Sequence, residues 1–363
     1  MSERLERLRT YLAGRDLDGV LITDAVHRHY FSGYSAEDHD LAVPQGALLV
    51  SQDVAILLTS PNNTEWAEAE APEFEVVGWG RPWVGSIVER IKSLGWRRVG
   101  FEDRAMSVAA HAALSSALSD DVTLVPLGDA LASPRTIKTA DDLAAIERAL
   151  ALTDIGFEAA QRHLRVGITE QQLAWEAERA MREAGADGVA FPVTVASGPH
   201  AARPHHRVTD RPITAGEPIV IDLGARINGF NGDLTRTIWL GEPDERLRSV
   251  YNLVLEAQEA ALAVLRDGLP ARDADRAARA VIQAAGFGDA FVHGLGHGLG
   301  MRVHEAPSLS PASNEILAAG MVTTVEPGIY LPGWGGVRIE DVAVIEPSGC
   351  RVLTRAPKLP RGE

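Results

Sequence analysis

The segment Ile221–Thr237, IDLGARINGFNGDLTRT, contains two aspartates at strand boundaries. Asp222 closes the apolar run PIVID, and Asp233 begins the next strand-like run after the turn INGFNG. We expect a hairpin here that brings both carboxylates inward, face to face. Aspartate is also common in turns at strand ends, so the pair by itself is equally compatible with a structural role.

A glycine-rich segment further along the chain carries three histidines. It reads HGLGHGLGMRVHE and contains His293, His297 and His304. The glycine spacing does not match the dinucleotide pattern G-x-G-x-x-G, and Ser308 stands where a zincin motif would need its second histidine. We therefore expect these glycines to let the backbone approach a crowded site.

Two glutamates lie in apolar, strand-like runs near the C-terminus. Glu326 follows the run MVTTV, and Glu340 follows VRI. Both are expected inside β-strands, where a buried carboxylate needs a partner. That partner is either a metal ion or a basic side chain, for instance Arg338, which would share a strand face with Glu340.

The C-terminal half thus offers a hard, oxygen-rich set of five candidate metal ligands: Asp222, Asp233, His297, Glu326 and Glu340. Such a set suits two neighbouring divalent ions, such as Mn²⁺, Co²⁺ or Zn²⁺, better than a tetrahedral structural zinc. Two ions can hold a hydroxide between them and polarise a carbonyl group. The sequence therefore predicts metal-assisted hydrolysis of an amide.

The order of predicted elements divides the 363 residues into two domains. Residues 1–133 alternate strand-like and helix-like runs, which is typical of an α/β domain. After the linker ASPRTIKTADD, a capping box of Thr139 and Asp142 predicts the start of a long helix over 140–164. Further helices are expected over 169–184, 244–264 and 271–285. With strand hairpins between them, residues 134–363 are predicted to form an α+β domain.

Composition excludes several classes of protein. The formal net charge of −15 argues against nucleic acid as the main partner. The N-terminus lacks the apolar core of a signal peptide, and no apolar run is long enough to cross a membrane. Cys350 is the single cysteine, so an intrachain disulfide is impossible. We expect a cytoplasmic protein in which Cys350 is a packing residue.

The motifs IDLGA, GDLTRT, HGLGHGLGMRVHE, TVEPGIY and GGVRIED resemble the creatinase/methionine aminopeptidase, or pita-bread, superfamily. The resemblance is closest to its Xaa-Pro peptidase branch, peptidase family M24B. It implies an α+β fold with a creatinase-like α/β N-terminal domain and a pita-bread catalytic domain. It further implies a homodimer, in which the N-terminal domain of one subunit lies near the active site of the other.

The resemblance also implies metal-binding roles. Asp222 would bind one ion and Asp233 would bridge both. His297 and Glu326 would bind the second ion, and Glu340 would bridge. A bridging hydroxide would attack the amide carbonyl, and Glu326 would pass its proton to the proline nitrogen.

The remaining roles that it implies concern the substrate. His205 would meet the substrate's main chain, and His293 and His304 would flank the scissile bond, with His304 stabilising the oxyanion. Arg338 would orient the metal-binding carboxylates. His206 matches no residue with a role in the family and is interpreted as incidental.

We expect an Xaa-Pro aminopeptidase that acts on peptides with proline at the second position, with two Mn²⁺ ions as the favoured cofactors. A strict Xaa-Pro dipeptidase is the alternative. Some strict dipeptidases that resemble this chain carry an arginine, which would bind the proline carboxylate, at the position of Ser308. Arg28 of a partner subunit could supply that positive charge instead. Remoter alternatives are a metal-free, non-peptidase relative, which should lack some of the five ligands, and a methionine aminopeptidase, which resembles only the C-terminal domain.

Overall fold

The computed structural model describes residues 2–40 and 43–359. The chain divides into two compact units, Met1–Arg135 and Thr136–Glu363. No helix within the described residues combines the length and apolarity that crossing a membrane requires.

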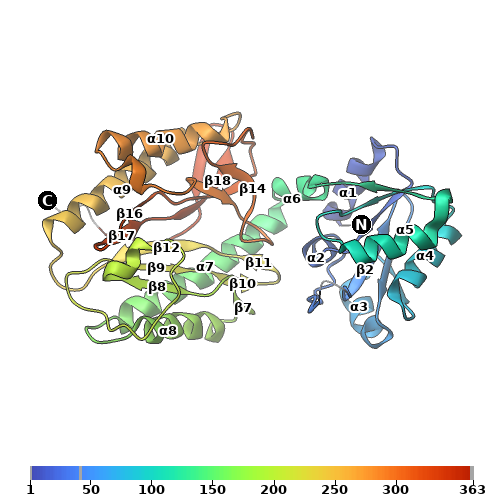
Figure 1. Cartoon of the computed structure of the whole chain (residues 1–363), viewed down its shortest axis with the longest axis horizontal. Helices are drawn as coiled ribbons and strands as arrows, with labels where there is room; N and C mark the ends of the chain where they lie inside the picture. The colour runs from blue at the N-terminus through green and yellow to red at the C-terminus, as the bar shows by residue number, and fades with distance from the viewer. Residues whose placement is uncertain (1, 41–42, 360–363) are drawn as a thin grey trace. The chain divides into compact units, whose positions relative to one another are not determined.

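The N-terminal unit is built around a mixed six-stranded sheet with the order β4-β3-β2-β1-β5-β6. Its strands are β1 (Gly19–Ile22), β2 (Gly46–Val50), β3 (Ala55–Thr59), β4 (Glu75–Gly78), β5 (Arg98–Phe101) and β6 (Thr123–Pro126). Its helices are α1 (Glu3–Ala13), α2 (Ala25–Ser32), α3 (Thr64–Glu70), α4 (Trp83–Ser93) and α5 (Val108–Leu118), and the short α6 (Ser133–Thr136) follows (Figure 1). The central strands β1 and β2 are buried throughout, as their continuous apolar runs require. The predicted α/β fold is confirmed.

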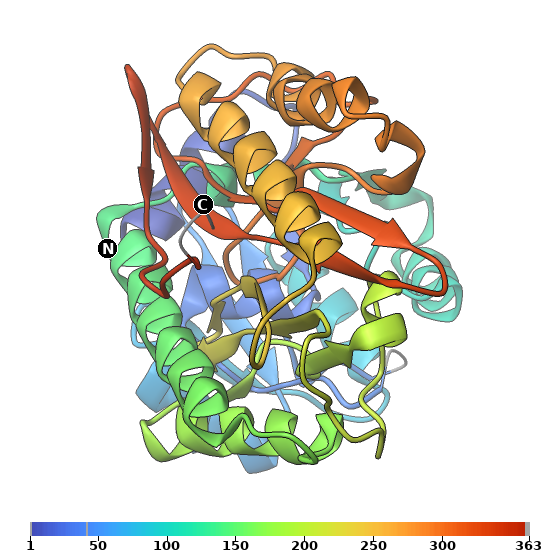
Figure 2. The same ribbon diagram turned by 90° about the vertical axis from the view of Figure 1, so that its left-hand side faces the viewer.

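The C-terminal unit contains two helix pairs on opposite sides of its strands. One pair is α7 (Ala140–His163) with α8 (Glu170–Glu183), and the other is α9 (Glu245–Val264) with α10 (Ala271–Ala284) (Figure 1). Figure 2 shows α7 and α9 flanking the strands from a second direction. The predicted capping box is formed, because Thr139 and Asp142 exchange side chain to backbone hydrogen bonds. Each helix pair covers its own apolar cluster.

Short antiparallel sheets fill the space between the helix pairs. The first has the order β12-β9-β8, from β8 (Thr194–Ser197), β9 (Ile219–Leu223) and β12 (Leu234–Ile238). Beside it lie β7 (Gly188–Val189), β10 (Ala225–Ile227) and β11 (Phe230–Asn231). A five-stranded sheet, β14-β13-β15-β18-β19, comprises β13 (Gly296–Gly298), β14 (Glu305–Leu309), β15 (Val322–Val325), β18 (Asp341–Glu346) and β19 (Gly349–Val352). The hairpin β16 (Gly328–Leu331) and β17 (Gly335–Arg338) completes the set.

The positions of Glu326 and Glu340 differ from the expectation. Both were expected inside strands, but Glu326 lies in the break between β15 and β16, and Glu340 in the break between β17 and β18. β15 pairs with β18 while β16 pairs with β17, so the chain changes sheets at both breaks. Pro327 has no N–H to continue a ladder, which helps to place the first break. The two breaks face each other, because Val325 pairs with Asp341 on one side of them and Gly328 with Arg338 on the other. Glu326 and Glu340 therefore lie on neighbouring segments where the hydrogen-bond ladders are interrupted.

Candidate active site

The β9–β12 pair places the first two carboxylates. Asp222 lies opposite Thr235 in the register, and Asp233 precedes Thr235 by two residues. Asp233 directly precedes β12, so the alternation of side chains along the chain places it on the side of the sheet that carries Thr235 and Asp222. Asp233 is buried, and Asp222 Oδ1 is a buried oxygen that has no hydrogen-bond partner among the described residues.

His297, Glu326 and Glu340 meet this pair from the other sheets. His297 Nε2 lies 3.2 Å from Glu326 Oε1 and 3.8 Å from Asp233 Oδ2. Asp233, His297 and Glu340 each offer a ligand atom, and these atoms all lie within 4.8 Å of one another. These distances place Asp233, His297, Glu326 and Glu340 in one cluster. Asp222 belongs to it as well, because its charge acts on Asp233 and Glu340.

The carboxylates of the cluster perturb one another strongly. Burial, followed by the charge of Glu340, raises the pKa of Asp233 well above its ordinary value. Burial, followed by the charges of Glu326 and Asp222, does the same to the pKa of Glu340. Burial also raises the pKa of Asp222. Burial would raise the pKa of Glu326 as well, but its hydrogen bond with His297 and the charges of His297, His293 and Arg338 together lower that pKa to about 2.

The histidine of the cluster is oriented for a cation. His297 Nδ1 lies 3.1 Å from the carbonyl oxygen of Gly298, so Nδ1 carries the proton and Nε2 faces the carboxylates. This backbone contact is the arrangement by which metal-binding histidines are usually fixed. Burial disfavours the charged ring, yet Glu326 and Glu340 raise the pKa of His297 to about 9. The ring is thus surrounded by negative charge that a cation would neutralise.

The donor set therefore fits divalent metal ions. Two buried carboxylates, Asp233 and Glu340, and two half-buried ones, Asp222 and Glu326, concentrate negative charge around one imidazole where water has little access. An unpaired charge in such a place is costly. Bound cations would compensate this charge and would satisfy the unpartnered Asp222 Oδ1. Hard oxygen donors with one imidazole are ligands for ions such as Mn²⁺, Co²⁺ or Zn²⁺.

Arg338 organises the edge of the cluster. Its Nη2 donates to Asp222 Oδ2 at 2.6 Å, its Nε to Thr235 Oγ1 at 3.1 Å, and its Nη1 to Tyr330 Oη at 2.9 Å and to the Pro204 carbonyl at 3.2 Å. The alternative ion pair of Arg338 with Glu340 is not the one formed. Arg338 ends β17 and turns toward the β9–β12 sheet, so its guanidinium reaches Asp222 instead.

His293 is held by Tyr330, a residue that sequence reasoning missed. His293 Nδ1 lies 2.7 Å from the Gly294 carbonyl, and its Nε2 lies 2.9 Å from Tyr330 Oη. Burial lowers the pKa of His293 and raises the pKa of Tyr330 to about 12. The neutral ring must therefore donate from Nδ1 and accept at Nε2 from the tyrosine hydroxyl. A buried tyrosine in TVEPGIY, which needs a hydrogen-bond partner, was the available indication.

His304 and His205 are exposed beside the buried cluster. The His304 ring centroid lies 4.3 Å from that of His297, and burial followed by the His297 charge lowers the pKa of His304. The charge of His205 also lowers the pKa values of His293 and His304. The three histidines assigned to the substrate therefore gather near one another. His206, interpreted as incidental, is instead buried and hydrogen-bonded to Glu170.

The glycines of the histidine-rich segment allow close strand packing, as expected. A Cβ at Gly296 would lie 2.1 Å from the Thr324 carbonyl oxygen, and one at Gly298 would lie 2.1 Å from that of Ala306. Neither position could carry a side chain without a shift of the backbone. The glycines thus bring β13, and with it His297, between β14 and β15.

Comparison with known proteins agrees with this geometry. Residues 144–347 match the model of metallopeptidase family M24, and residues 4–137 match that of the creatinase/prolidase N-terminal domain. The Xaa-Pro dipeptidase of Pyrococcus furiosus is 35% identical over 359 residues, with 99% of each chain covered.

Two solved structures extend the comparison, each covering 98% of both chains. The Xaa-Pro dipeptidase from Bacillus anthracis has a TM-score of 0.92 at 34% identity, and the X-Pro aminopeptidase from Thermotoga maritima has a TM-score of 0.90 at 32% identity. Family and fold agree over the whole length of the chain. The protein therefore belongs to metallopeptidase family M24, with the N-terminal domain of creatinases and prolidases joined to a pita-bread catalytic domain.

Proposed function

We propose that the protein is a metal-dependent exopeptidase that hydrolyses the Xaa-Pro bond at the N-terminus of peptides, an Xaa-Pro aminopeptidase. The observation that carries this proposal is the buried cluster of four carboxylates and His297, with three further histidines beside it. The similarity to Xaa-Pro peptidases over the whole chain supports the substrate class. A metal-free relative is disfavoured, because all five donors are present.

Two divalent ions, for which we favour Mn²⁺, would be held by Asp222, Asp233, His297, Glu326 and Glu340. When bound, such ions polarise an amide carbonyl and lower the pKa of water to yield a nucleophile. Asp233 and Glu340 would be the ligands whose charge most needs the ions, because burial and neighbouring carboxylates raise the pKa of each well above its ordinary value.

The protein's own side chains would then transfer the proton and stabilise the negative charge that develops on the carbonyl oxygen. Thr324 Oγ1 donates to Glu326 Oε1 at 3.1 Å, which orients this carboxylate to accept a proton and pass it to the proline nitrogen. His304 is exposed toward solvent and can donate a hydrogen bond to the carbonyl oxygen as charge develops there. Arg338 fixes Asp222 through Oδ2. An Xaa-Pro amide has no N–H, so the site needs no acceptor for one.

The surroundings of Ser308 support activity on peptides longer than dipeptides. Ser308 lies opposite His297 in the strand register, and its N–H donates to Glu315 Oε2 at 2.6 Å. A substrate carboxylate placed there would meet an anion. Arg28, considered as a clamp from a partner subunit, is fully buried in the N-terminal unit, where it pairs with Asp38 at 2.9 Å. It is therefore already engaged within its own domain.

A strict Xaa-Pro dipeptidase is the second candidate. Arg203 and Arg207 are exposed on either side of His205, and a guanidinium is the natural clamp for a proline carboxylate. The names of the Pyrococcus furiosus and Bacillus anthracis relatives also favour this alternative.

Comparing kcat/KM for Ala-Pro, Ala-Pro-Ala and Ala-Pro-Ala-Ala in the presence of Mn²⁺ tests the proposal. We expect the longer peptides to be cleaved at least as well as the dipeptide. Ala-Ala-Ala and N-acetyl-Ala-Pro-Ala are the controls for the proline and for the free amino group, and neither should be cleaved. A preference for Ala-Pro of about 100-fold, or about 2.7 kcal/mol of transition-state binding, would establish the dipeptidase instead.

We further propose that the enzyme is a cytoplasmic homodimer, and light scattering of the purified protein tests the dimer. Elution as a monomer at the concentration of the assay would contradict it.

A further inference from the structure

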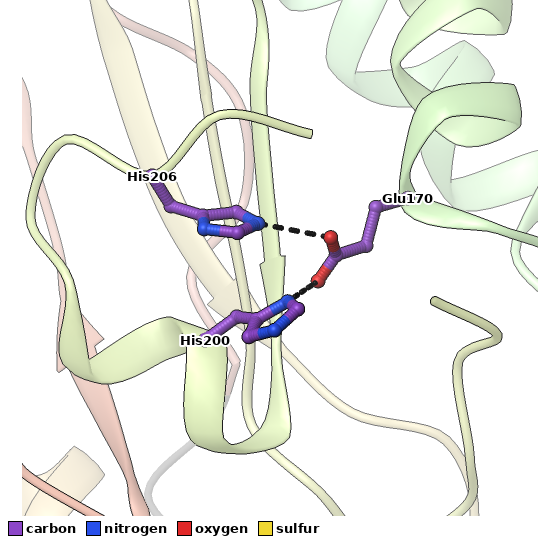
Figure 3. Close-up of side chains that lie close together, drawn as sticks. All are labelled: Glu170, His200 and His206. Atoms are coloured by element: carbon purple, nitrogen blue, oxygen red, sulfur yellow. Dashed lines mark hydrogen bonds and ion pairs between the residues drawn. The ribbon is translucent and has the colours of Figure 1, made fainter. Parts of the chain in front are cut away.

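Glu170 is a fully buried carboxylate outside the candidate metal cluster. It is the first residue of α8, and its two oxygens accept six hydrogen bonds. Oε1 accepts from Ser197 N at 2.9 Å, Ser197 Oγ at 2.8 Å and His200 Nδ1 at 2.9 Å. Oε2 accepts from His206 Nε2 at 2.9 Å, Thr209 N at 3.2 Å and Thr209 Oγ1 at 2.7 Å. Figure 3 shows the two imidazoles converging on this carboxylate.

Glu170, His200 and His206 resemble a metal site in composition, but their hydrogen bonds indicate another role. A carboxylate offers about four lone-pair directions, and six donors already occupy them. Burial would raise the pKa of Glu170, yet the bonds from His206, Ser197 and Thr209 lower it to about 2. The anion is therefore satisfied by the protein itself, and a cation would have to displace these donors.

The donors tie three separate stretches of chain to the start of α8. Ser197 ends β8, His200 lies in the following 3-10 turn, and His206 and Thr209 lie in the irregular segment 203–209. Thr194 Oγ1 adds a hydrogen bond to the His206 carbonyl at 3.2 Å. One buried charge therefore holds a segment that has no helix or strand of its own.

The same segment is attached to the active site from its other side. Arg338 Nη1 donates to the Pro204 carbonyl at 3.2 Å, while Glu170 holds His206. His205 lies between these two anchored residues and is exposed, next to the buried His206. The backbone of His205 is therefore constrained on both sides while its ring stays available.

We propose that Glu170 is a positioning residue, which fixes the segment 203–209 through His206 and Thr209 so that His205 meets the substrate's main chain. The role of His205 at the substrate rests on the proposed function. Six converging donors require an acceptor with no hydrogens, so a glutamine at position 170 would turn its NH₂ group toward donors and release part of the segment. Misplacement of a substrate-binding group by about 1 Å can cost on the order of 100-fold in rate.

The first test compares Glu170→Gln with Glu176→Gln, a matched change at a half-buried position of the same helix, where the carboxylate pairs with Arg179 and not with the segment 203–209. Amide hydrogen exchange of residues 203–209 in the metal-loaded, full-length enzyme should accelerate in Glu170→Gln and stay as in wild type in Glu176→Gln. The content of bound metal should be equal in all three proteins. Unchanged exchange in Glu170→Gln would overturn the proposal, and this measurement needs no substrate.

A double-mutant cycle separates positioning of His205 from general destabilisation. Glu170→Gln should lower kcat/KM for Ala-Pro-Ala by about 10- to 100-fold, mainly through KM. In a His205→Ala background the same substitution should change kcat/KM by less than about 3-fold, because the group that it misplaces is already absent. An equal loss in both backgrounds would overturn the proposal. A wild-type enzyme that cleaves no Xaa-Pro peptide would instead refute the proposed function, and the exchange result would still stand.

A second pair of variants covers the case in which Glu170→Gln does not fold. Glutamine can place an N–H close to the position of a histidine Nε2, whereas leucine cannot. His206→Gln should therefore retain the protection of residues 203–209 and most of kcat/KM, and His206→Leu should lose both. A His206→Leu enzyme with wild-type exchange and kinetics would overturn the proposal.

Discussion

Replacing Arg338 by methionine should destabilise the catalytic unit and misorient its metal-binding carboxylates. Methionine fills much of the same volume but donates no hydrogen bond. The change would leave Asp222 without its 2.6 Å ion pair and would remove the bonds to Thr235, Tyr330 and the Pro204 carbonyl. Asp222, whose Oδ1 is buried, would then stand among other carboxylates with no guanidinium to balance its charge.

The structure sets the size of this effect. Arg338 is almost fully buried, and removing one partner of a buried ion pair costs about 3–5 kcal/mol. Arg351→Met is the matched control. Arg351 pairs with Glu147 at 2.9 Å, but both side chains are more than 40% exposed, and such pairs are worth about 0–1 kcal/mol. Asp222→Asn in the Arg338→Met protein should recover part of the loss, because the uncompensated charge is then gone.

Native-state amide hydrogen exchange of Ile219–Leu223 measures this effect within the catalytic unit. In metal-free protein at pH 7, Arg338→Met should reduce the protection of these amides by about 10²- to 10⁴-fold. Arg351→Met should reduce it by less than about 5-fold. Equal loss of protection in the two variants would refute a stabilising role for the Arg338–Asp222 ion pair, as would the absence of any recovery when Asp222→Asn is added to Arg338→Met.

Three further predictions follow from the cluster. Chelation should abolish activity, and added Mn²⁺ or Co²⁺ should restore it. Asp233→Ala and Glu340→Ala should each remove nearly all activity while the protein stays folded. Full turnover by a sample that elemental analysis shows to be metal-free would contradict this prediction. His304→Ala should lower kcat by roughly 10²- to 10³-fold with metal content retained, whereas His297→Ala should reduce metal occupancy, and equal metal loss in both would show that the two roles are misassigned. Because burial and neighbouring charges raise the pKa values of Asp233 and Glu340, the metal-free native state favours their protonated forms. Their contribution to stability is therefore present below the ordinary carboxyl range and is lost as pH rises through the raised pKa values. In EDTA, Asp233→Asn should stabilise the protein against urea, and increasingly so as the pH rises above the ordinary carboxyl range. A stabilisation independent of pH would exclude this cause.

Local patterns predicted much of the fold. The capping box at Thr139 gave the start of α7 at the observed residue, because its two hydrogen bonds are made within one turn. The helices expected over 169–184 and 271–285 are observed as Glu170–Glu183 and Ala271–Ala284. Apolar periodicity reports which face of a segment is buried, so it locates such elements without reference to the rest of the chain.

Long-range contacts were harder to predict. Arg338 was considered as a partner of Glu340 two residues away, yet it binds Asp222, 116 positions earlier in the chain. Tyr330 went unnoticed although it fixes the tautomer of His293, and His206 was interpreted as incidental although it binds Glu170. In each case the partner lies on another sheet or helix, and spacing along the chain carries no information about it.

The sequence by itself determined the chemical identity of the candidate site, because five hard donors and three nearby histidines are a property of composition and local motif. It also determined the class of each domain, since apolar periodicity and caps act within a few residues. The tertiary structure alone decided which of these groups form ion pairs and hydrogen bonds with one another. It brings Glu326 and Glu340 to the two points where the chain passes between sheets, and it directs Arg338 to Asp222 and Glu170 to His206. Coulombic and hydrogen-bond energies depend on distances in space, and only the packing of sheets against helices sets those distances.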